Sequence, residues 1–175
     1  MARLLGATGI ALLKGVETLR LRAYDDLRPN HVLVEGDEVL GKLTNGYGHT
    51  GPDVFIGQEI DEEQADNWLL ADSSADVKAV DANTPDDLTQ NAFDALCVFA
   101  YNVGAHAFIG STMDKLLQAG EPMKAAQEFI KWNKSGGKVL GGLTRRRKME
   151  KILFLTPDDV TPDYSKVTED PNAWP

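Results

Sequence analysis

The pattern of apolar and polar positions changes character twice along the chain. Apolar residues recur at the spacing of one helix face over residues 8–20, which predicts a helix. Residues 31–49 instead alternate between apolar and polar positions and contain a Gly36-Asp37 turn, which predicts a small antiparallel sheet. From residue 61 to about residue 155 the period is helical again, interrupted by glycines and prolines. The pattern therefore places one short sheet between helices.

The remaining segments define the domain organisation. Residues 156–175 hold four of the eight prolines and few apolar residues, so we expect an extended acidic tail after a single domain over residues 1–155. No apolar run reaches the length of roughly 18–20 residues that a membrane span requires. The apolar residues 4–13 are interrupted by two glycines and lead into charged helix positions, so we do not interpret them as a signal peptide.

Charge is unevenly distributed. The 175 residues carry a formal net charge of −9, which disfavours nucleic acid and anionic membranes as partners. Residues 131–155, however, carry a net charge of +7, and the tail carries −4. The basic segment is open to two interpretations at this point: a solvated helix face, or a positive surface that steers the protein to an anionic target at low ionic strength.

Glu17 is the first candidate for chemistry. In a helix over residues 8–20 it would lie on the same face as Ile10 and Leu13, so the apolar face would point a carboxyl group inward. Burial favours the protonated form of a carboxyl group, which is the form that a general acid needs. The alternative is an ordinary amphipathic helix in which Glu17 pairs with Arg20 or Arg22, and periodicity alone favours that alternative.

Asp25 and Asp26 follow where the chain turns toward the predicted sheet. A carboxylic acid on a helix and a carboxylate beside it are the pair that a glycosidase uses, one to protonate the leaving oxygen and the other to activate water or attack. Paired acids also occur as Ca²⁺ ligands or in solvated loops, and no oxygen-rich loop of the EF-hand type surrounds these two. Spacing alone does not choose between a glycosidase and a solvated loop.

Several motifs, taken in order, resemble the phage-type lysozymes, the endolysin or muramidase family of the lambdoid and T4-like phages. That family has a Glu, an Asp nine residues later, and a Thr that opens a glycine-rich strand ending in His. The resemblance covers residues 8–155, and linked motifs in one order make chance improbable. The matching segments are Gly9-Ile10, Leu13-Lys14, Glu17, Leu19-Arg20-Leu21, Ala23-Tyr24-Asp25-Asp26, Thr44-Asn45-Gly46-Tyr47-Gly48-His49-Thr50, Phe99-Ala100-Tyr101-Asn102-Val103-Gly104, Ser111-Thr112, Trp132 and Leu143-Thr144-Arg145-Arg146-Arg147.

The resemblance implies an α+β lysozyme-like fold, with a small lobe of helix and hairpin, a larger helical lobe and a substrate cleft between them. By position, Glu17 resembles the general acid of the family, Asp26 the carboxylate that activates water, and Thr44 a hydroxyl that lines the same cleft. The family inverts anomeric configuration, which implies carboxyl groups roughly 6.5–9.5 Å apart with a water molecule between them.

The resemblance also suggests residues that contact the sugar. Tyr47, Gly48, Tyr101 and Ser111 match cleft-facing positions, although each also fits simple packing and Ser111 fits a helix N-cap equally well. His49 adjoins the site, and its family counterpart is structural, paired with an acidic group. The arginines of the basic segment match family residues that lie near the cleft or hold the last helix in place.

One departure from the family is large. The 17 residues between Asp26 and Thr44 exceed what typical members have there. Because this segment alternates and contains a turn signal, we expect an elongated hairpin inserted at about residues 27–43. Its acidic residues are expected to be solvated.

The function implied by the resemblance is hydrolysis of the β-1,4 bond between N-acetylmuramic acid and N-acetylglucosamine in bacterial peptidoglycan, leading to lysis of a host cell. Two carboxyl groups supply the acid and the base, so no metal or cofactor is expected. The expected partners are peptidoglycan glycan strands, acted on by a monomer that accumulates in the host cytoplasm and reaches the periplasmic wall through a holin. The alternative is a non-catalytic module that binds peptidoglycan or acts as a scaffold.

Overall fold

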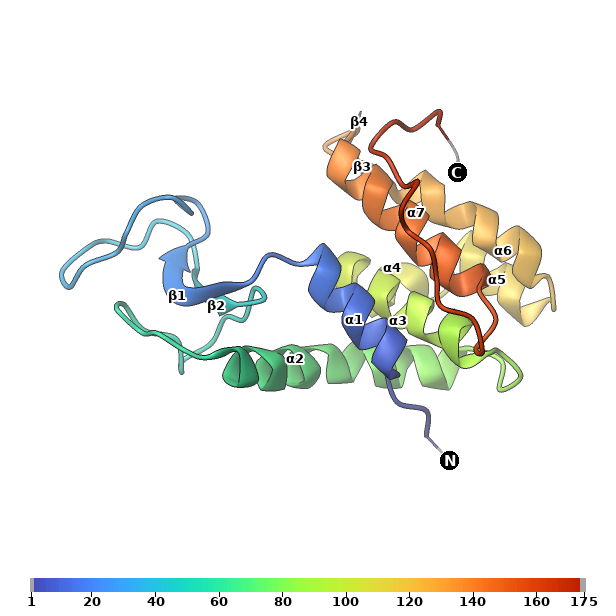
Figure 1. The fold of residues 1–175 in the computed structure, drawn as a ribbon, viewed down its shortest axis with the longest axis horizontal. Coiled ribbons are helices and arrows are strands. Elements are labelled where there is room, and N and C mark those ends of the chain that lie inside the picture. Colours follow the sequence, from blue (N-terminus) through green and yellow to red (C-terminus); the bar gives the residue numbers. More distant parts are fainter. Residues whose placement is uncertain (1, 174–175) are drawn as a thin grey trace. The chain divides into compact units, whose positions relative to one another are not determined.

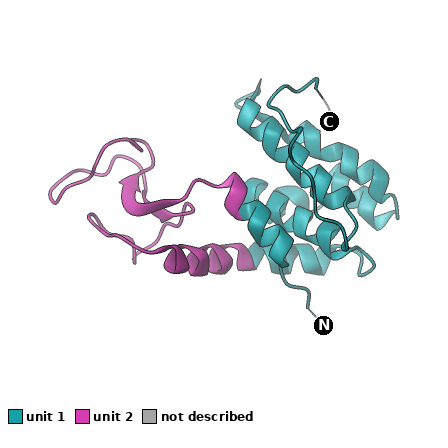
Figure 2. Cartoon of the chain, in the orientation of Figure 1, with its two compact units in different colours: residues 1–13, 75–175 teal, residues 14–74 magenta. Residues whose placement is uncertain are grey.

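The computed structural model describes residues 2–173, which form two compact units (Figure 2). One unit, called the helical unit below, comprises the N-terminal residues up to Leu13 together with the chain from Ala75 onward. The other, called the hairpin unit, comprises Lys14–Ser74. Two helices, α1 (Ala7–Val16) and α2 (Glu62–Asn83), run across the sequence boundaries between them (Figure 1). None of the helices in the described residues is both long enough and apolar enough to cross a membrane.

The helical unit is built around α3 (Gln90–Val103), whose residues 91–100 are all buried. The ring of Phe99 meets three other aromatic rings edge to face, those of Phe108, Phe129 and Trp132, with centroids 5.3–6.4 Å apart. Such pairs add to the stabilisation from apolar burial. The other elements are α4 (Ala105–Phe108), α5 (Thr112–Gln118), α6 (Pro122–Glu128), the 3₁₀ helix η1 (Phe129–Trp132), the short strands β3 (Lys134–Ser135) and β4 (Lys138–Val139), and α7 (Gly141–Leu155).

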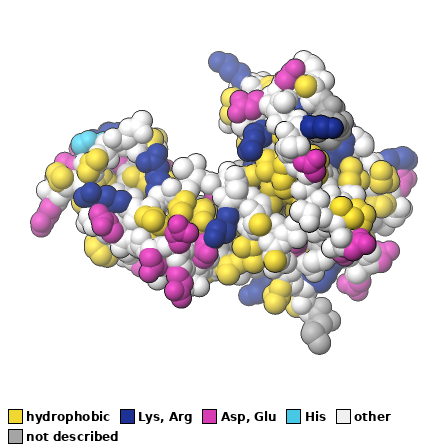
Figure 3. Space-filling model, in the orientation of Figure 1, with side chains coloured by type: hydrophobic (Ala, Val, Ile, Leu, Met, Phe, Trp, Pro, Cys, Tyr) yellow, Lys and Arg dark blue, Asp and Glu magenta, His cyan; other side chains and the backbone are white. Residues whose placement is uncertain are grey.

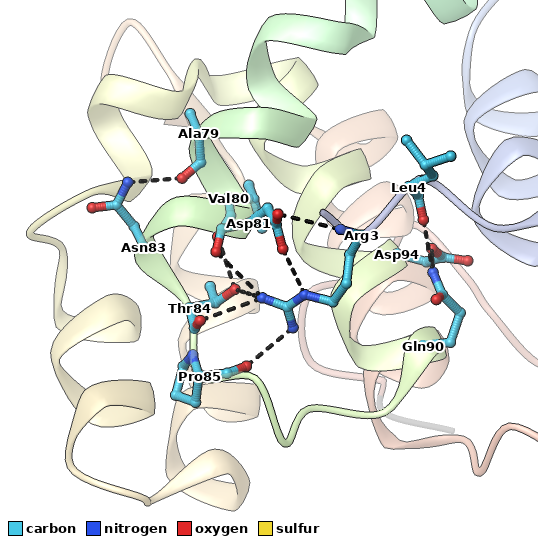
Figure 4. A network of polar contacts seen from close by, with 10 residues as sticks. All are labelled: Arg3, Leu4, Ala79, Val80, Asp81, Asn83, Thr84, Pro85, Gln90 and Asp94. Atoms are coloured by element: carbon cyan, nitrogen blue, oxygen red, sulfur yellow. Dashed lines mark hydrogen bonds and ion pairs between the residues drawn. The ribbon is translucent and has the colours of Figure 1, made fainter. Parts of the chain in front are cut away.

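Within the helical unit, Arg3 joins the N-terminal segment to the end of α2 and the residues after it (Figure 4). The guanidinium group of Arg3 donates to the carboxylate of Asp81 at 2.7 Å, to the hydroxyl of Thr84 at 2.8 Å and to the carbonyl of Pro85 at 3.0 Å. It also lies over the ring of Phe93, 4.4 Å from its centroid. These contacts fix the chain that leads into α1.

The basic segment is solvated only in part, because Lys131, Lys134, Lys138 and Arg145 are exposed whereas its other four basic residues are not. Arg146, Arg147, Lys148 and Lys151 in α7 are all buried. Arg146 and Arg147 both lie 3.1 Å from the carboxylate of Glu150, and Arg147 also stacks over the ring of Phe99. Buried cations need such partners, because an unpaired charge is costly to remove from water. These side chains therefore hold the last helix in place.

Residues 156–173 of the tail contain no helix or strand, and they contact helices of the helical unit (Figure 1). The carboxylate of Asp158 accepts hydrogen bonds from the backbone N–H groups of Gln90 and Asn91 at 3.0 and 2.8 Å, which caps the start of α3. The ammonium group of Lys148 donates to the carbonyls of Asp170 and Ala173. The tail therefore supplies hydrogen-bond partners to the start of α3 and to the buried ammonium group of Lys148. The sequence pattern did not predict these contacts.

The hairpin unit contains a two-stranded antiparallel sheet, with β1 (Arg20–Asp25) paired to β2 (Leu43–Gly46). The expected helix over residues 8–20 was too long, because α1 ends at Val16 and residues 17–19 lead into β1, which pairs with β2 from Arg20 onward. Nonlocal pairing here overrides local helical periodicity. The register places Tyr24 opposite Thr44 and Asp25 opposite Leu43.

The segment between the strands differs from the elongated hairpin that we expected. Residues 27–42 connect two paired strands, but none of them is in a strand. Local side-chain acceptors explain this: Asp37 accepts the backbone N–H of Val34, and Asp25 accepts three backbone N–H groups of the segment. Aspartates that bind nearby backbone groups in this way compete with strand pairing. We call residues 27–42 the inserted loop.

Charged side chains of both signs lie close together on both units, on the face shown in Figure 3. The net charge of −9 therefore does not translate into a single acidic surface on that face.

Candidate active site

Glu17 lies in a bend directly after the last residue of α1, and it is half-buried. It is therefore not on the helix face that periodicity predicted, but in the short connection that leads from α1 into β1. The two arginines considered as its partners are engaged elsewhere. Arg20 donates to the carbonyl of Pro29 at 2.7 Å, and Arg22 lies 3.8 Å from the carboxylate of Glu59.

Asp26 directly follows β1 and is exposed. Its backbone N–H donates to the carbonyl of Lys42 at 3.1 Å, and its Oδ1 accepts the backbone N–H of Lys42 at 2.7 Å. These two bonds extend the β1–β2 ladder by one residue and hold the side chain of Asp26 as well as its backbone. An acceptor held in this way remains available to solvent on its other oxygen.

Tyr24 links the two carboxylates. Burial raises the pKa of its phenol, nearby Arg20 lowers it, and the negative charges of Asp26 and Glu17 raise it further, with a net increase. Both carboxylates therefore act on the same half-buried phenol. The sequence did not identify Tyr24 as a site residue, although it is part of the Ala23-Tyr24-Asp25-Asp26 motif.

Thr44 faces Tyr24 across the sheet and is buried. Its hydroxyl donates to the carbonyl of Lys42 at 3.1 Å, the same residue that binds Asp26. The structure thus brings Asp26 and Thr44 together at Lys42, beside Tyr24, whose pKa is also raised by the charge of Glu17.

The glycine-rich turn after β2 carries Tyr47 and Gly48. His49 and Asn45 exchange two backbone hydrogen bonds at 2.8 and 2.9 Å, which close the turn. Gly48 is exposed, whereas Tyr47 is buried and has the ammonium group of Lys14 5.8 Å from its ring centroid. The burial of Tyr47 favours a packing role for most of its ring.

His49 has the acidic partners that the sequence analysis expected. Its Nδ1 lies 2.9 Å from Asp72 and its Nε2 3.1 Å from Asp53, while the ring stacks on Trp68 with centroids 4.2 Å apart. Burial lowers the pKa of His49, but the hydrogen bonds to Asp72 and Asp53 outweigh it and leave the pKa above its usual value. Both ring nitrogens are occupied, which fits a structural role.

Tyr101 and Ser111 belong to the helical unit. Tyr101 is half-buried near the end of α3. Ser111 is the N-cap of α5, and its hydroxyl accepts the backbone N–H of Asp114 at 3.2 Å. The N-cap interpretation of Ser111 is therefore confirmed, and its proposed contact with sugar stays a prediction.

The helical unit also has a pocket of about 460 Å³ that the sequence analysis did not identify. It combines an indole ring with two ammonium groups, a composition suited to a ligand with both apolar and anionic parts. Its lining comes from three separate segments, so no local pattern in the sequence marks it. The lining residues are Asn102, Val103, Lys131, Trp132, Lys134, Ser135 and Leu143.

Comparison with known proteins supplies a family. Residues 14–150 match the family described as phage lysozyme. The chain is 44% identical over 165 residues to an endolysin of Bacillus phage B103, and 38% identical over 150 residues to an endolysin of Acyrthosiphon pisum secondary endosymbiont phage 1. These matches cover 94% and 83% of the chain. They cover 58% of the first relative and 94% of the second, so the chain spans little more than half the length of the Bacillus phage protein.

Solved structures agree with the fold. An endolysin from Escherichia coli O157:H7 phage FAHEc1 superimposes with a TM-score of 0.76 at 35% identity, covering 93% of this chain and 99% of that one. The muramidase domain of SpmX from Asticaccaulis excentricus gives a TM-score of 0.73 at 36% identity, covering 89% of this chain and 100% of that domain. The α+β architecture with a small two-stranded sheet is thus lysozyme-like.

Proposed function

The chain belongs to the phage lysozyme family, and from that premise we propose that it is an endolysin that hydrolyses bacterial peptidoglycan. The bond cleaved is the β-1,4 linkage between N-acetylmuramic acid and N-acetylglucosamine, and cleavage leads to lysis of the host cell. The observation that carries this proposal is the fixed position of Asp26 nine residues after Glu17, the spacing of the family: its carboxylate is bound by Lys42, to which Thr44 is also bound.

The proposed reaction assigns one role to each carboxyl group. Protonated Glu17 donates its proton to the glycosidic oxygen as the bond from that oxygen to C1 of the muramic acid breaks. A water molecule attacks C1 from the opposite face and transfers a proton to Asp26. One displacement of this kind inverts the configuration at C1. Solvent exchange then restores the proton of Glu17 and removes the one on Asp26.

The remaining site residues support binding in this proposal. The hydroxyl of Thr44, anchored beside Asp26 through Lys42, orients the attacking water or the sugar. The exposed backbone at Gly48 offers a contact to a glycan from the hairpin unit, next to the buried Tyr47, whose contact with sugar stays a prediction. For Tyr101 and Ser111 in the helical unit, contact of the ring and of the hydroxyl with sugar stays a prediction from the resemblance.

Product analysis tests the reaction. Purified peptidoglycan is incubated with the chain, the products are reduced with borohydride, and the reduced sugar at each new end is identified. A muramidase produces reduced N-acetylmuramic acid, and proton NMR of the fresh product shows the α-anomer if the reaction inverts. Reduced N-acetylglucosamine at the new ends would contradict the bond assignment, and a fresh β-anomer would contradict inversion.

The same experiment separates hydrolysis from binding alone. A non-catalytic module would sediment with peptidoglycan and release no reducing ends. Retention of a complete Glu17, Asp26 and Thr44 set favours the enzyme, because binding alone does not require a paired acid and base.

Delivery to the wall is part of the proposal. We expect the chain to act on the wall after a holin opens the inner membrane, and to act as a monomer. Expression in a bacterial host with and without a holin tests the route: lysis only with the holin is the expected result. Lysis by the chain alone would contradict holin dependence.

A further inference from the structure

The inserted loop is tied together at its base by one aspartate. Asp25 is fully buried, with no exposed side-chain surface. Its Oδ1 accepts the backbone N–H groups of Leu27 and Gly41, both at 3.0 Å. Its Oδ2 accepts the backbone N–H of Leu40 at 2.9 Å and the Nε of Arg28 at 3.1 Å. The four donors come from both ends of the loop, so this carboxylate closes it.

Asp25 is ionised in this arrangement. Burial raises its pKa, but the hydrogen bonds from Leu40, Leu27, Arg28 and Gly41 outweigh burial and leave the pKa below its usual value. An ionised carboxylate has only acceptor sites, and here both oxygens are occupied by donors. Such a group holds surrounding backbone strongly, because charge-assisted hydrogen bonds exceed neutral ones in strength.

The closed base of the loop contacts the neighbouring aspartate. The residue after Gly41 is Lys42, whose backbone N–H and carbonyl are the two groups that bind Asp26. Two hydrogen bonds, joined by the peptide bond between Gly41 and Lys42, therefore connect the carboxylate of Asp25 to that of Asp26. The hydroxyl of Thr44 donates to the carbonyl of Lys42 and so joins the same network.

Gly41 adds a steric constraint. A Cβ atom at this position would lie 1.9 Å from Oδ1 of Asp26, 2.8 Å from Leu27 and 2.9 Å from Oδ1 of Asp25. Real Cβ atoms do not approach heavy atoms so closely, so any side chain at position 41 must displace the carboxylate of Asp26. The glycine allows the loop backbone to pass directly beside that carboxylate.

We propose that Asp25 and Gly41 are positioning residues, through which the inserted loop holds the carboxylate of Asp26 in place for the attacking water. This inference rests on the proposed function, since it assigns a purpose to the geometry of the proposed base. It gives the inserted loop a specific role: the long connection between β1 and β2 is closed by Asp25, and Lys42 at its end supplies the bonds to Asp26.

Two substitutions test the proposal with a soluble peptidoglycan fragment of defined length as substrate. Asp25→Asn replaces one acceptor oxygen by an NH₂ group, which cannot accept the backbone N–H donors that surround it. Gly41→Ala places a methyl group where it must displace the carboxylate of Asp26. We expect each to lower kcat by about 10- to 100-fold, the effect of a small misplacement of a catalytic group, with little change in KM.

Matched controls come from the same chain. Asp37→Asn removes the carboxylate that organises the tip of the loop, where Asp37 binds Val34 and His31, and contacts neither Asp26 nor Lys42. Gly142→Ala adds a methyl group where nothing lies within 4 Å. Both controls are expected to keep wild-type kcat.

A double-mutant cycle distinguishes positioning from a general loss of structure. In an Asp26→Asn background, Asp25→Asn and Gly41→Ala should lower the residual rate no further, because the group on which they act has gone. If Asp25→Asn does not fold, as judged by its thermal unfolding, Gly41→Ala decides alone. Wild-type kcat in both positioning variants would overturn the inference, as would an equal loss in the Asp26→Asn background. Failure of the proposed function itself looks different, since Asp26→Asn would then retain the wild-type rate.

Discussion

At the scale of single residues, His49 joins three segments of the hairpin unit. Its ring stacks on Trp68 of α2 and bonds to Asp72 of the same helix, while its other nitrogen bonds to Asp53 in the loop after β2. The raised pKa of His49 means that the folded state binds a proton more tightly than the unfolded state does. The protonated ring therefore stabilises the fold.

The pH dependence of the stability follows from the raised pKa of His49. The stabilisation is complete below the pKa of an unfolded histidine, about 6.5, and is lost as the pH rises through the higher pKa of the folded protein. We expect His49→Gln to lower the free energy of unfolding more at pH 5.5 than at pH 9, measured by urea denaturation. The comparison with wild type at each pH removes the contribution of other titrating groups. An equal loss at both values would contradict a protonated His49 in the fold.

At the scale of elements, the end of α3 depends on one glycine. Gly104 has φ +87° and ψ +136°, a backbone conformation that side chains other than glycine rarely adopt, and its N–H donates to the carbonyl of Ala100 at 2.7 Å. The next helix, α4, begins at the following residue. This conformation therefore ends one helix and starts another.

A substitution measures that dependence. Gly104→Ala should lower the free energy of unfolding by about 1–3 kcal/mol, the range for a non-glycine residue held in such a conformation. Nothing lies within 4 Å of a Cβ at position 104 or at position 142, so neither methyl group causes a clash. Gly142→Ala, in the first turn of α7 and without positive φ, should change stability much less. Equal losses in the two variants, by chemical denaturation, would rule out backbone strain as the cause.

The sequence predicted most helices of the chain but not the form of the sheet. Local signals sufficed for α3 and α5, where Gly104 and Ser111 mark a helix end and a helix start. The end of α1 was missed because residues 20–25 pair with residues 43–46, a nonlocal contact that helical periodicity does not encode. We expected strands in the inserted loop because its apolar and polar positions alternate in the sequence. The hydrogen bonds from Asp37 and Asp25 to its backbone, which compete with strand pairing, cannot be recognised in the sequence.

The candidate site, too, was predicted from the sequence only in part. Glu17, Asp26 and Thr44 were predicted from spacing and resemblance; the structure joins Asp26 and Thr44 through Lys42, and the catalytic roles of all three stay predictions. The roles of Asp25 and Gly41 were not predictable, because their contacts join residues 15 or 16 positions apart through a loop of irregular geometry. Adjacent aspartates look alike in sequence, whereas in the structure one is buried and the other exposed.

At the scale of the whole molecule, the basic side chains Arg146, Arg147, Lys148 and Lys151 are buried inside the helical unit. The fully buried ammonium group of Lys148 is bound by tail carbonyls, and Asp158 of the tail caps α3. The tail thus adds polar contacts to two helices of the helical unit. The proline content and few apolar residues of the tail, which predicted an extended segment, did not reveal these contacts.

Tail variants quantify this contribution. Asp158→Ala should lower the free energy of unfolding by about 1 kcal/mol, the usual cost of losing a helix cap. Truncation after Leu155 should cost more, because it also leaves a buried cation without its carbonyl partners. Asp159→Ala, at the exposed neighbouring position, serves as the control. Thermal unfolding that is unchanged by the truncation would show that the tail does not stabilise the helical unit.

The central claim is that Glu17 is the general acid of a peptidoglycan hydrolase, and the rate at which the chain clears outer-membrane-stripped Gram-negative cells tests it most directly. Glu17→Gln keeps the size of the side chain but cannot donate the proton, so clearing should slow by about 10²- to 10⁴-fold, the usual contribution of a general acid. Unchanged thermal unfolding would show that the variant is folded. Clearing by Glu17→Gln at the wild-type rate would contradict the assignment.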